Sequence, residues 1–177
     1  MSNFGAELAA MAATQVGYVE GANNANKYGE YFGANNQPWC AYFILWCMAQ
    51  LGVDGMADGF TGNVASFYSK NNTSVDSLVT GDIVCFGYNR SYWSSPKQHN
   101  EIFISYNDDG TLNTIGGNTS GADGEGVWRK VRGRDEVSAA IHYDPLDTSD
   151  PLPSPTDPPT GAFLVKPYSY YRTLNRW

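Results

Sequence analysis

The chain has 177 residues, of which 42% are hydrophobic, and it carries a formal net charge of −7 with a sequence pI near 4.6. This length fits about one domain and is enough to bury a substantial core. The acidic balance argues against nucleic acid and anionic membrane surfaces as partners, because both attract basic patches.

The cysteines and the N-terminus bear on the compartment. Cys40, Cys47 and Cys85 are too few, and odd in number, for a disulfide scaffold, so we predict free thiols in a protein made in a reducing cytosol. The first 21 residues lack the basic start, apolar run and cleavage site of a signal peptide. We therefore expect synthesis in the cytoplasm, and any action outside the cell would need a route other than a standard secretion signal.

The first predicted element is a helix from about Phe4 to Val16. Its apolar residues fall near helical spacing, at Leu8, Met11, Ala12 and Val16. The segment "GANNANKYGEYFGANNQP" that begins at Gly21 is dense in Asn and Gly, which predicts an irregular loop.

A second helix is predicted from about Trp39 to Leu51, in the uncharged stretch "QPWCAYFILWCMAQLGV". Pro38 suits the first helical turn and Gly52 suits the end. The densely apolar part spans only Trp39 to Met48, whereas a membrane-spanning helix needs roughly 20 apolar residues. Because the stretch is apolar nearly all round, it predicts a buried core helix rather than a membrane segment.

The rest of the domain reads as short strands. After a possible short helix at 63–71, β-rich runs lie at 82–88, 101–107, 111–118, 127–132 and 138–143, with the hairpin signal "NDDGT" between two of them. Helices followed by an antiparallel meander predict an α+β fold with the helices packed on one face of the sheet.

A proline-rich segment ends the predicted domain. We place the domain at 1–146 and the segment at 147–161, which favours a semi-rigid polyproline linker. The remaining tail, 162–177, is too short to fold alone. It is either the start of a truncated wall-binding module or a tail that docks on a surface.

Cys40 is the first candidate for chemistry, because it falls at the predicted start of the buried helix. Unpaired N–H groups and the helix dipole favour a thiolate there. The alternative is that Cys40 is a small buried hydrophobe, as is common for cysteine in an apolar helix. Cys47, two turns later, and Cys85, within a strand, are interpreted as core residues.

A nucleophilic cysteine needs a base, and the chain has two histidines. His99 opens a strand next to an aromatic loop, which favours it over His142, whose place at the end of the last strand indicates packing or exposure to solvent. Asn118 lies in a glycine-rich bend after a strand and could orient the base through its amide oxygen. Taken alone, each of these three residues has an ordinary structural interpretation.

Five segments in order resemble the CHAP family: "GYVEGANNANKYGEYFG", "QPWCAYFILWC", "GDIVCFG", "HNEIFI" and "TIGGNTSG". This family comprises cysteine, histidine-dependent amidohydrolases and peptidases of the papain-like superfamily, many of them phage endolysins. The resemblance covers about Phe4 to Asp144. It implies a papain-like fold with Cys40 as nucleophile, His99 as base and Asn118 as orienter.

The chain departs from the family pattern at two positions. Many members have Glu where this chain has Gly116, and often a small residue where this chain has Glu101. Strand alternation puts Glu101 on the same face as His99, so Glu101 could replace the missing carboxylate from another strand. The alternative is a salt bridge at the rim of the cleft.

Further expectations concern ligands. The backbone N–H of Cys40, with Gln37 as a supporting residue, could stabilise an oxyanion. Tyr88, Tyr92 and Trp93 could line a substrate groove or only pack within their own loop. We expect no metal and no cofactor, because Glu30 is the only carboxylate between Glu20 and Cys40 and no zinc, phosphate or dinucleotide motif is present.

These observations together predict a monomeric, phage endolysin-like peptidoglycan hydrolase. It would cut either the muramoyl–alanine amide or a bond in the stem or crossbridge peptide, and a holin would release it to the wall. The alternatives are a non-catalytic wall-binding module, a virion-associated or injected wall-degrading effector, and an amidase or transglutaminase-like enzyme acting on protein.

Overall fold

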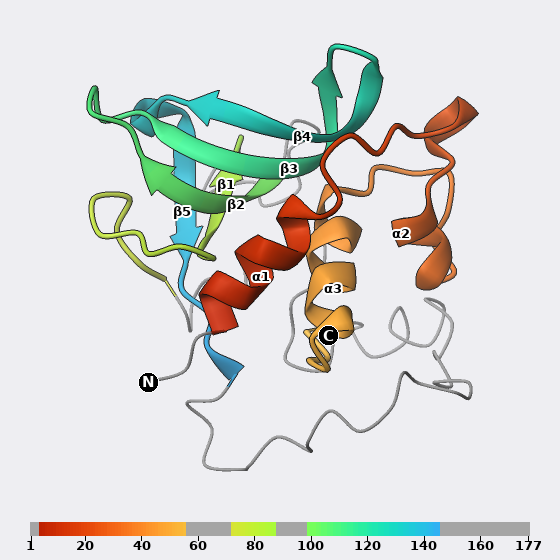
Figure 1. The fold of residues 1–177 in the computed structure, drawn as a ribbon, viewed down its shortest axis with the longest axis horizontal. Helices are drawn as coiled ribbons and strands as arrows, with labels where there is room; N and C mark the ends of the chain where they lie inside the picture. The colour runs from red at the N-terminus through yellow and green to blue at the C-terminus, as the bar shows by residue number, and fades with distance from the viewer. Residues whose placement is uncertain (1–3, 56–71, 88–98, 146–177) are drawn as a thin grey trace, which may run out of the picture.

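The computed structural model describes residues 4–55, 72–87 and 99–145, which fold as an α+β domain of papain-like type. In Figure 1 the helices lie together on one side of a single strongly curved sheet. The predicted short helix at 63–71, the linker at 147–161 and the tail at 162–177 all lie outside the described residues.

The first helix, α1, is Phe4–Ala13 and ends earlier than the pattern predicts. The hydroxyl of Thr14 donates to the carbonyl of Met11 at 2.6 Å, a side-chain bond of the kind that competes with continued helix. Gly17 then adopts a φ of 96°, and its N–H donates to the carbonyl of Val127. The chain therefore leaves the helix and joins the edge of the sheet.

The loop that follows is more ordered than its composition suggests. It contains a 3₁₀ turn, η1 (Ala22–Asn24), and a short helix, α2 (Lys27–Tyr31). Asn26 caps α2, since its side chain accepts from the N–H of Gly29 at 2.6 Å. The prediction of an entirely irregular loop is wrong at this point.

The uncharged stretch forms α3, Cys40–Gln50, within one residue of the predicted bounds at each end. Most of its side chains are buried between the other helices and the sheet, among them Phe43, Ile44 and Cys47. No helix in the described part of the chain has the length and hydropathy to cross a membrane.

Five antiparallel strands make the sheet: β1 (Ile83–Phe86), β2 (His99–Tyr106), β3 (Leu112–Gly121), β4 (Gly124–Arg132) and β5 (Val137–Ile141). The first four form the predicted meander. The sheet order is β4-β3-β2-β1-β5, so β5 returns to pair with β1 at the opposite edge. The 3₁₀ turn η2 (Arg134–Glu136) connects β4 to β5.

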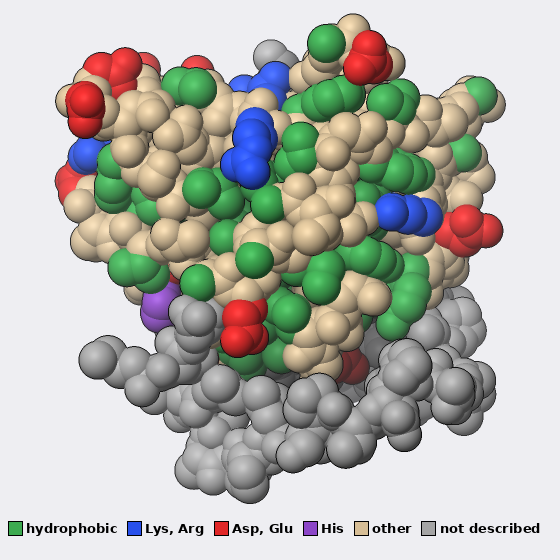
Figure 2. Space-filling view, viewed as in Figure 1, with side chains coloured by type: hydrophobic (Ala, Val, Ile, Leu, Met, Phe, Trp, Pro, Cys, Tyr) green, Lys and Arg blue, Asp and Glu red, His purple; other side chains and the backbone are tan. Residues whose placement is uncertain are grey.

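The core has two parts, one on each face of the sheet. The larger one joins the helices to alternate residues of the strands, such as Ile83, Cys85 and Ile102. The smaller one lies on the far face around Val84, Phe103 and other apolar side chains. On the face drawn in Figure 2, acidic and basic side chains lie scattered without a broad basic patch.

Candidate active site

Cys40 and His99 meet at one end of the sheet. Cys40 is the first residue of α3 and is partly exposed, while His99 is the first residue of β2, opposite Phe86 of β1. The imidazole of His99 lies close enough to the thiol of Cys40 to lower its pKa through hydrogen bonding and charge. The two residues that the sequence singled out therefore form a pair, although they lie 59 positions apart.

The surroundings of the Cys40 thiol favour its ionisation to a thiolate. Burial opposes a thiolate and by itself raises the pKa of Cys40, but the hydrogen bond and charge of His99 act against it. Backbone N–H groups of Asn100 and Ala41 act in the same direction as His99, so the net pKa of Cys40 is lowered. Burial raises the pKa of Cys47 and of Cys85, which lie fully inside the core as predicted.

Glu101 holds the other side of the imidazole. Its Oε1 lies 3.0 Å from His99 Nε2, which leaves Nδ1 for the thiol. Burial alone would lower the pKa of His99, but its hydrogen bonds to Cys40 and Glu101 raise that pKa to about 9. The histidine is thus held as an imidazolium next to a thiol of lowered pKa.

The Glu101 side chain is itself fully buried and held by further partners. Arg132 donates to it through Nε, at 3.1 and 3.2 Å from the two carboxylate oxygens, and through Nη2, while the Thr114 hydroxyl donates to Oε2. Burial would raise the pKa of Glu101, but the hydrogen bonds from His99 and Arg132 hold it at about 2. Glu101 is therefore a buried anion inside the sheet. It pairs with Arg132 there and does not form an exposed salt bridge at the rim of the cleft.

Gly116 explains how this carboxylate is accommodated. It pairs directly with Glu101 across β2 and β3, and a Cβ at Gly116 would lie 2.8 Å from Glu101 Cγ and 2.9 Å from Oε1. The two departures from the family pattern are therefore one structural feature: the space next to Gly116 holds the carboxylate of Glu101.

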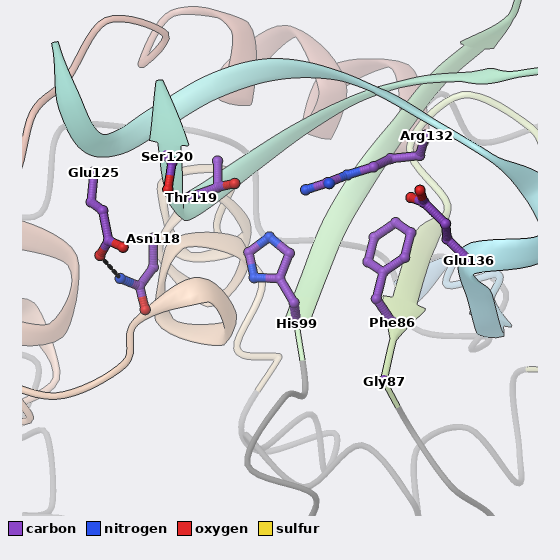
Figure 3. A pocket seen from close by; sticks show the side chains of 9 residues that line it. All are labelled: Phe86, Gly87, His99, Asn118, Thr119, Ser120, Glu125, Arg132 and Glu136. Atoms are coloured by element: carbon purple, nitrogen blue, oxygen red, sulfur yellow. Dashed lines mark hydrogen bonds between the residues drawn. The ribbon is translucent and has the colours of Figure 1, made fainter. Parts of the chain in front are cut away.

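Asn118 does not make the contact that was expected of it. Its Oδ1 accepts from the backbone N–H of Trp39 at 3.0 Å, and its Nδ2 lies 3.3 to 3.4 Å from oxygens of Glu20, Asn24 and Glu125. In Figure 3 the side chain points toward Glu125 and away from His99. Glu101 has the orienting contact with His99, whereas Asn118 connects β3 to the start of α3.

The remaining predicted residues are placed as follows. The Gln37 side chain donates from Nε2 to the carbonyl of Ala34 at 3.1 Å, which fixes it in the loop before Cys40. Tyr88, Tyr92 and Trp93 lie outside the described residues.

His142 lies apart from this cluster. Its Nδ1 is 2.7 Å from Oδ1 of buried Asp82, and about half of its side chain is exposed. Burial raises the pKa of Asp82, against hydrogen bonds from Val79 and His142.

Arg132 and Thr114 are the partners that sequence reasoning missed. Arg132 lies in a strand with alternating exposure and could pass for a solvent-facing residue. Its guanidinium lies 5.2 Å from the ring centroid of Phe86, and that ring stacks on the ring of His99 with centroids 6.2 Å apart. Only the pairing of the three strands β2, β3 and β4 shows that Arg132 and Thr114 converge on Glu101.

A cavity of about 500 Å³ runs along the His99 side of the pair. Figure 3 shows Asn118 and Glu125 at one end, the His99 ring in the middle, and Phe86, Arg132 and Glu136 at the other end. Among residues 4–55, 72–87 and 99–145, no group of three or more His, Cys, Asp or Glu side chains is arranged to hold a metal ion.

A family model described as the CHAP domain matches residues 32–118, which include Cys40, His99, Glu101 and Asn118. Residues 32–118 therefore form a CHAP domain. CHAP domains are in general cysteine- and histidine-dependent amidohydrolases and peptidases that act on peptidoglycan. Neither the comparison with curated proteins nor the comparison with solved structures gives a match.

Proposed function

We propose that this CHAP domain hydrolyses an amide bond of bacterial peptidoglycan, with Cys40 as nucleophile, His99 as acid and base, and Glu101 as the residue that orients His99. The observation that carries the proposal is the chain of contacts from Cys40 through His99 to the buried carboxylate of Glu101 and to Arg132. A thiol of lowered pKa next to a histidine of raised pKa is the ion pair that cysteine hydrolases use.

Acylation starts from the thiolate–imidazolium pair. The sulfur of Cys40 bonds to the amide carbon, and the carbonyl π electrons move to oxygen. The backbone N–H at the start of α3 is a donor for that oxyanion, and Gln37 could add its second amide hydrogen. When the C–N bond breaks, the leaving nitrogen takes the proton of the His99 imidazolium, which leaves a thioester on Cys40.

Deacylation restores the pair. Neutral His99 takes a proton from water as the oxygen adds to the thioester carbon. The tetrahedral intermediate then expels the thiolate of Cys40 and releases a carboxylic acid. Each cycle therefore consumes one water and returns both Cys40 and His99 to their starting charge.

The position of the cavity indicates which half of the substrate lies on the His99 side of the site. It is lined by His99 and not by Cys40, and the group that donates the proton must lie next to the leaving nitrogen. We infer that the amine half of the substrate occupies this cavity. That half is a peptide in either target, the muramoyl–alanine amide or a bond in the stem or crossbridge peptide.

The decisive experiment is digestion of purified sacculi, followed by mass spectrometry of the released fragments. Wild-type protein should release muropeptides with a new amine and a new carboxylate at one bond type, and Cys40→Ala and Cys40→Ser should release none. Release by a folded Cys40→Ala variant would rule out Cys40 as the nucleophile. Wall binding without release by the wild type would favour a non-catalytic module.

Two further parts of the proposal concern the substrate and the setting. A protein-directed amidase or transglutaminase-like enzyme would leave sacculi intact while modifying protein substrates. An endolysin role, with synthesis in the host cytoplasm and holin-dependent release, predicts lysis from outside by added protein but no lysis from inside unless a holin is expressed as well.

A further inference from the structure

Asn100 occupies an unusual position on β2. It directly follows His99, pairs with Cys85 of β1, and is only 2% exposed. Successive side chains of a strand point to opposite faces, so Asn100 faces the helices together with Ile102, while Glu101 faces the far side. A polar amide is thus buried next to the start of α3, and a buried amide is stabilised by its hydrogen bonds.

The amide of Asn100 is close to the reacting sulfur. Its Nδ2 lies 3.9 Å from Cys40 Sγ, within donor range of a large and polarisable sulfur atom. The backbone N–H of Asn100 also hydrogen-bonds the thiol and lowers its pKa. One residue therefore presents two donors to the sulfur.

We propose that Asn100 is a further catalytic residue, whose side-chain amide orients the sulfur of Cys40 and stabilises it as a thiolate. The proposal deepens the proposed function and rests on it. A thiolate only accepts hydrogen bonds, and donors strengthen when the acceptor is charged. The same donor assists again in deacylation, when the thiolate is the leaving group.

The two residues after His99 would then act from opposite faces of the strand, each on one member of the ion pair. Glu101 stabilises the imidazolium from the far face, and Asn100 stabilises the thiolate from the helix face. Both halves of the ion pair are held by consecutive residues on one rigid element, which fixes their separation.

The test compares wild type with Asn100→Leu, which is close in volume and has no donor, and with Asn100→Asp, which keeps the shape and replaces the donor by an acceptor. The pH dependence of Cys40 alkylation by iodoacetamide is measured by mass spectrometry of the Cys40 peptide, alongside thermal melting and release of muropeptides. We expect the midpoint of alkylation to move to higher pH in both variants. Hydrolysis near neutral pH should fall by about tenfold or more, the scale of a hydrogen bond to a charged group.

Asn113→Leu is the matched control, because Asn113 lies on β3 and bonds to Ser105 and Asn107, away from the thiol. It should leave the alkylation midpoint unchanged. An unchanged midpoint in folded Asn100→Leu would overturn the proposal.

If both Asn100 variants fail to fold, NMR of the wild type gives the answer. The side-chain NH₂ signals of Asn100 should shift as Cys40 ionises and again when it is alkylated, and signals insensitive to both would overturn the proposal. Alkylation and NMR do not depend on the wall substrate. A failure of the proposed function, seen as no muropeptide release by wild type, is therefore distinguishable from a failure of the role of Asn100.

Discussion

His99 has a different acidic partner on each side of its ring. The thiol of Cys40 gains from an imidazolium, and so does the buried carboxylate of Glu101. Because both partners favour the charged ring, they overcome the burial that would otherwise discharge it. The upper pH limit of the ion pair therefore depends on Glu101 as well as on Cys40 itself.

Glu101→Gln should shift the pH profile of wall hydrolysis from its alkaline side. Without the carboxylate, one of the two groups that raise the pKa of His99 is lost and the pKa falls below about 9, so the imidazolium is lost at lower pH. The alkaline limb should move to lower pH, and the rate at the optimum should fall less than it does in His99→Ala, which should be inactive. Initial rates of amide cleavage across pH measure both effects.

His142→Ala is the control, since His142 is the other histidine and pairs with Asp82 at a different place. It should leave the pH limits of hydrolysis unchanged, at some cost in stability. Unchanged limits in folded Glu101→Gln would mean that Glu101 is structural and does not tune His99.

Single residues were partly predictable from sequence. Cys40 at a helix start and His99 at a strand start carry a local signal, and the alternation of β2 put Glu101 beside His99. The partners of Glu101 carry no such signal, because Thr114 and Arg132 reach it only through the pairing of strands. The amide of Asn118 was expected at His99, but its contact with Trp39 spans 79 positions and follows from tertiary packing alone.

At the scale of elements, Asn118 links β3 to α3. It lies at an irregularity of register between β3 and β4 and has a φ of 55°, a left-handed conformation that Asn tolerates better than most residues. Its bond to the Trp39 N–H satisfies one of the free donors at the start of the helix that carries Cys40. We infer that Asn118 positions the nucleophile.

Asn118→Gly should lower wall hydrolysis by roughly tenfold, because the start of α3 loses its tie to the sheet while glycine keeps the left-handed backbone without strain. The alkaline limb of the pH profile should not move, since the contacts of His99 are untouched. A limb that shifts as it does in Glu101→Gln would show instead that Asn118 acts on the base.

The pairing of Glu101 on β2 with Gly116 on β3 leads to a second prediction, which concerns moving the carboxylate between the two strands. Gly116→Glu alone should be nearly inactive, because a second carboxylate and its Cβ cannot share the space that Glu101 fills. Glu101→Ala combined with Gly116→Glu places the carboxylate on β3, so the double variant should recover at least several-fold over either single variant. Rates of hydrolysis and thermal melting of all three variants test this.

A Gly116→Ala variant serves as the steric control, since it adds the Cβ without the charge. A double variant no better than the single ones would mean that the carboxylate can act only from β2.

Elements whose bounds are set by nearby residues could be predicted from the sequence, whereas those that depend on long-range pairing could not. The bounds of α3 and of the hairpin at 107–111 come from local proline, glycine and aspartate signals, and the prediction is confirmed for both. The place of β5 beside β1 was not predicted, because nothing near residues 137–141 specifies which edge of the sheet is open. α2 was missed although Asn26 is an ordinary capping residue, since a five-residue helix has no periodicity to detect.

At the scale of the whole molecule, two buried carboxyls make opposite contributions to stability. Glu101 bonds to His99 and Arg132, and its pKa lies at about 2. Asp82 is nearly as buried, but its partner His142 is half exposed. Burial is the largest influence on Asp82 and raises its pKa. The net charge of −7 reflects many acidic side chains. Among the described residues, Glu101 and Asp82 are the buried carboxyls, and the pKa of each is shifted.

The final prediction concerns unfolding by acid. The contribution of Glu101 is present above its unfolded pKa, about 4.3, and is lost as pH falls through the folded value of about 2. Asp82 works the other way: its raised pKa favours the folded state at low pH, and that contribution is lost as pH rises through the folded pKa. Between pH 5 and pH 3, the melting temperature should therefore fall less in Glu101→Gln than in wild type, and more in Asp82→Asn. Differential scanning calorimetry at both pH values gives the three slopes, which separate these groups from the exposed carboxylates that all three proteins share. Equal slopes would show that neither buried carboxyl changes its proton affinity on folding, and would remove the basis for a charged Glu101 behind His99.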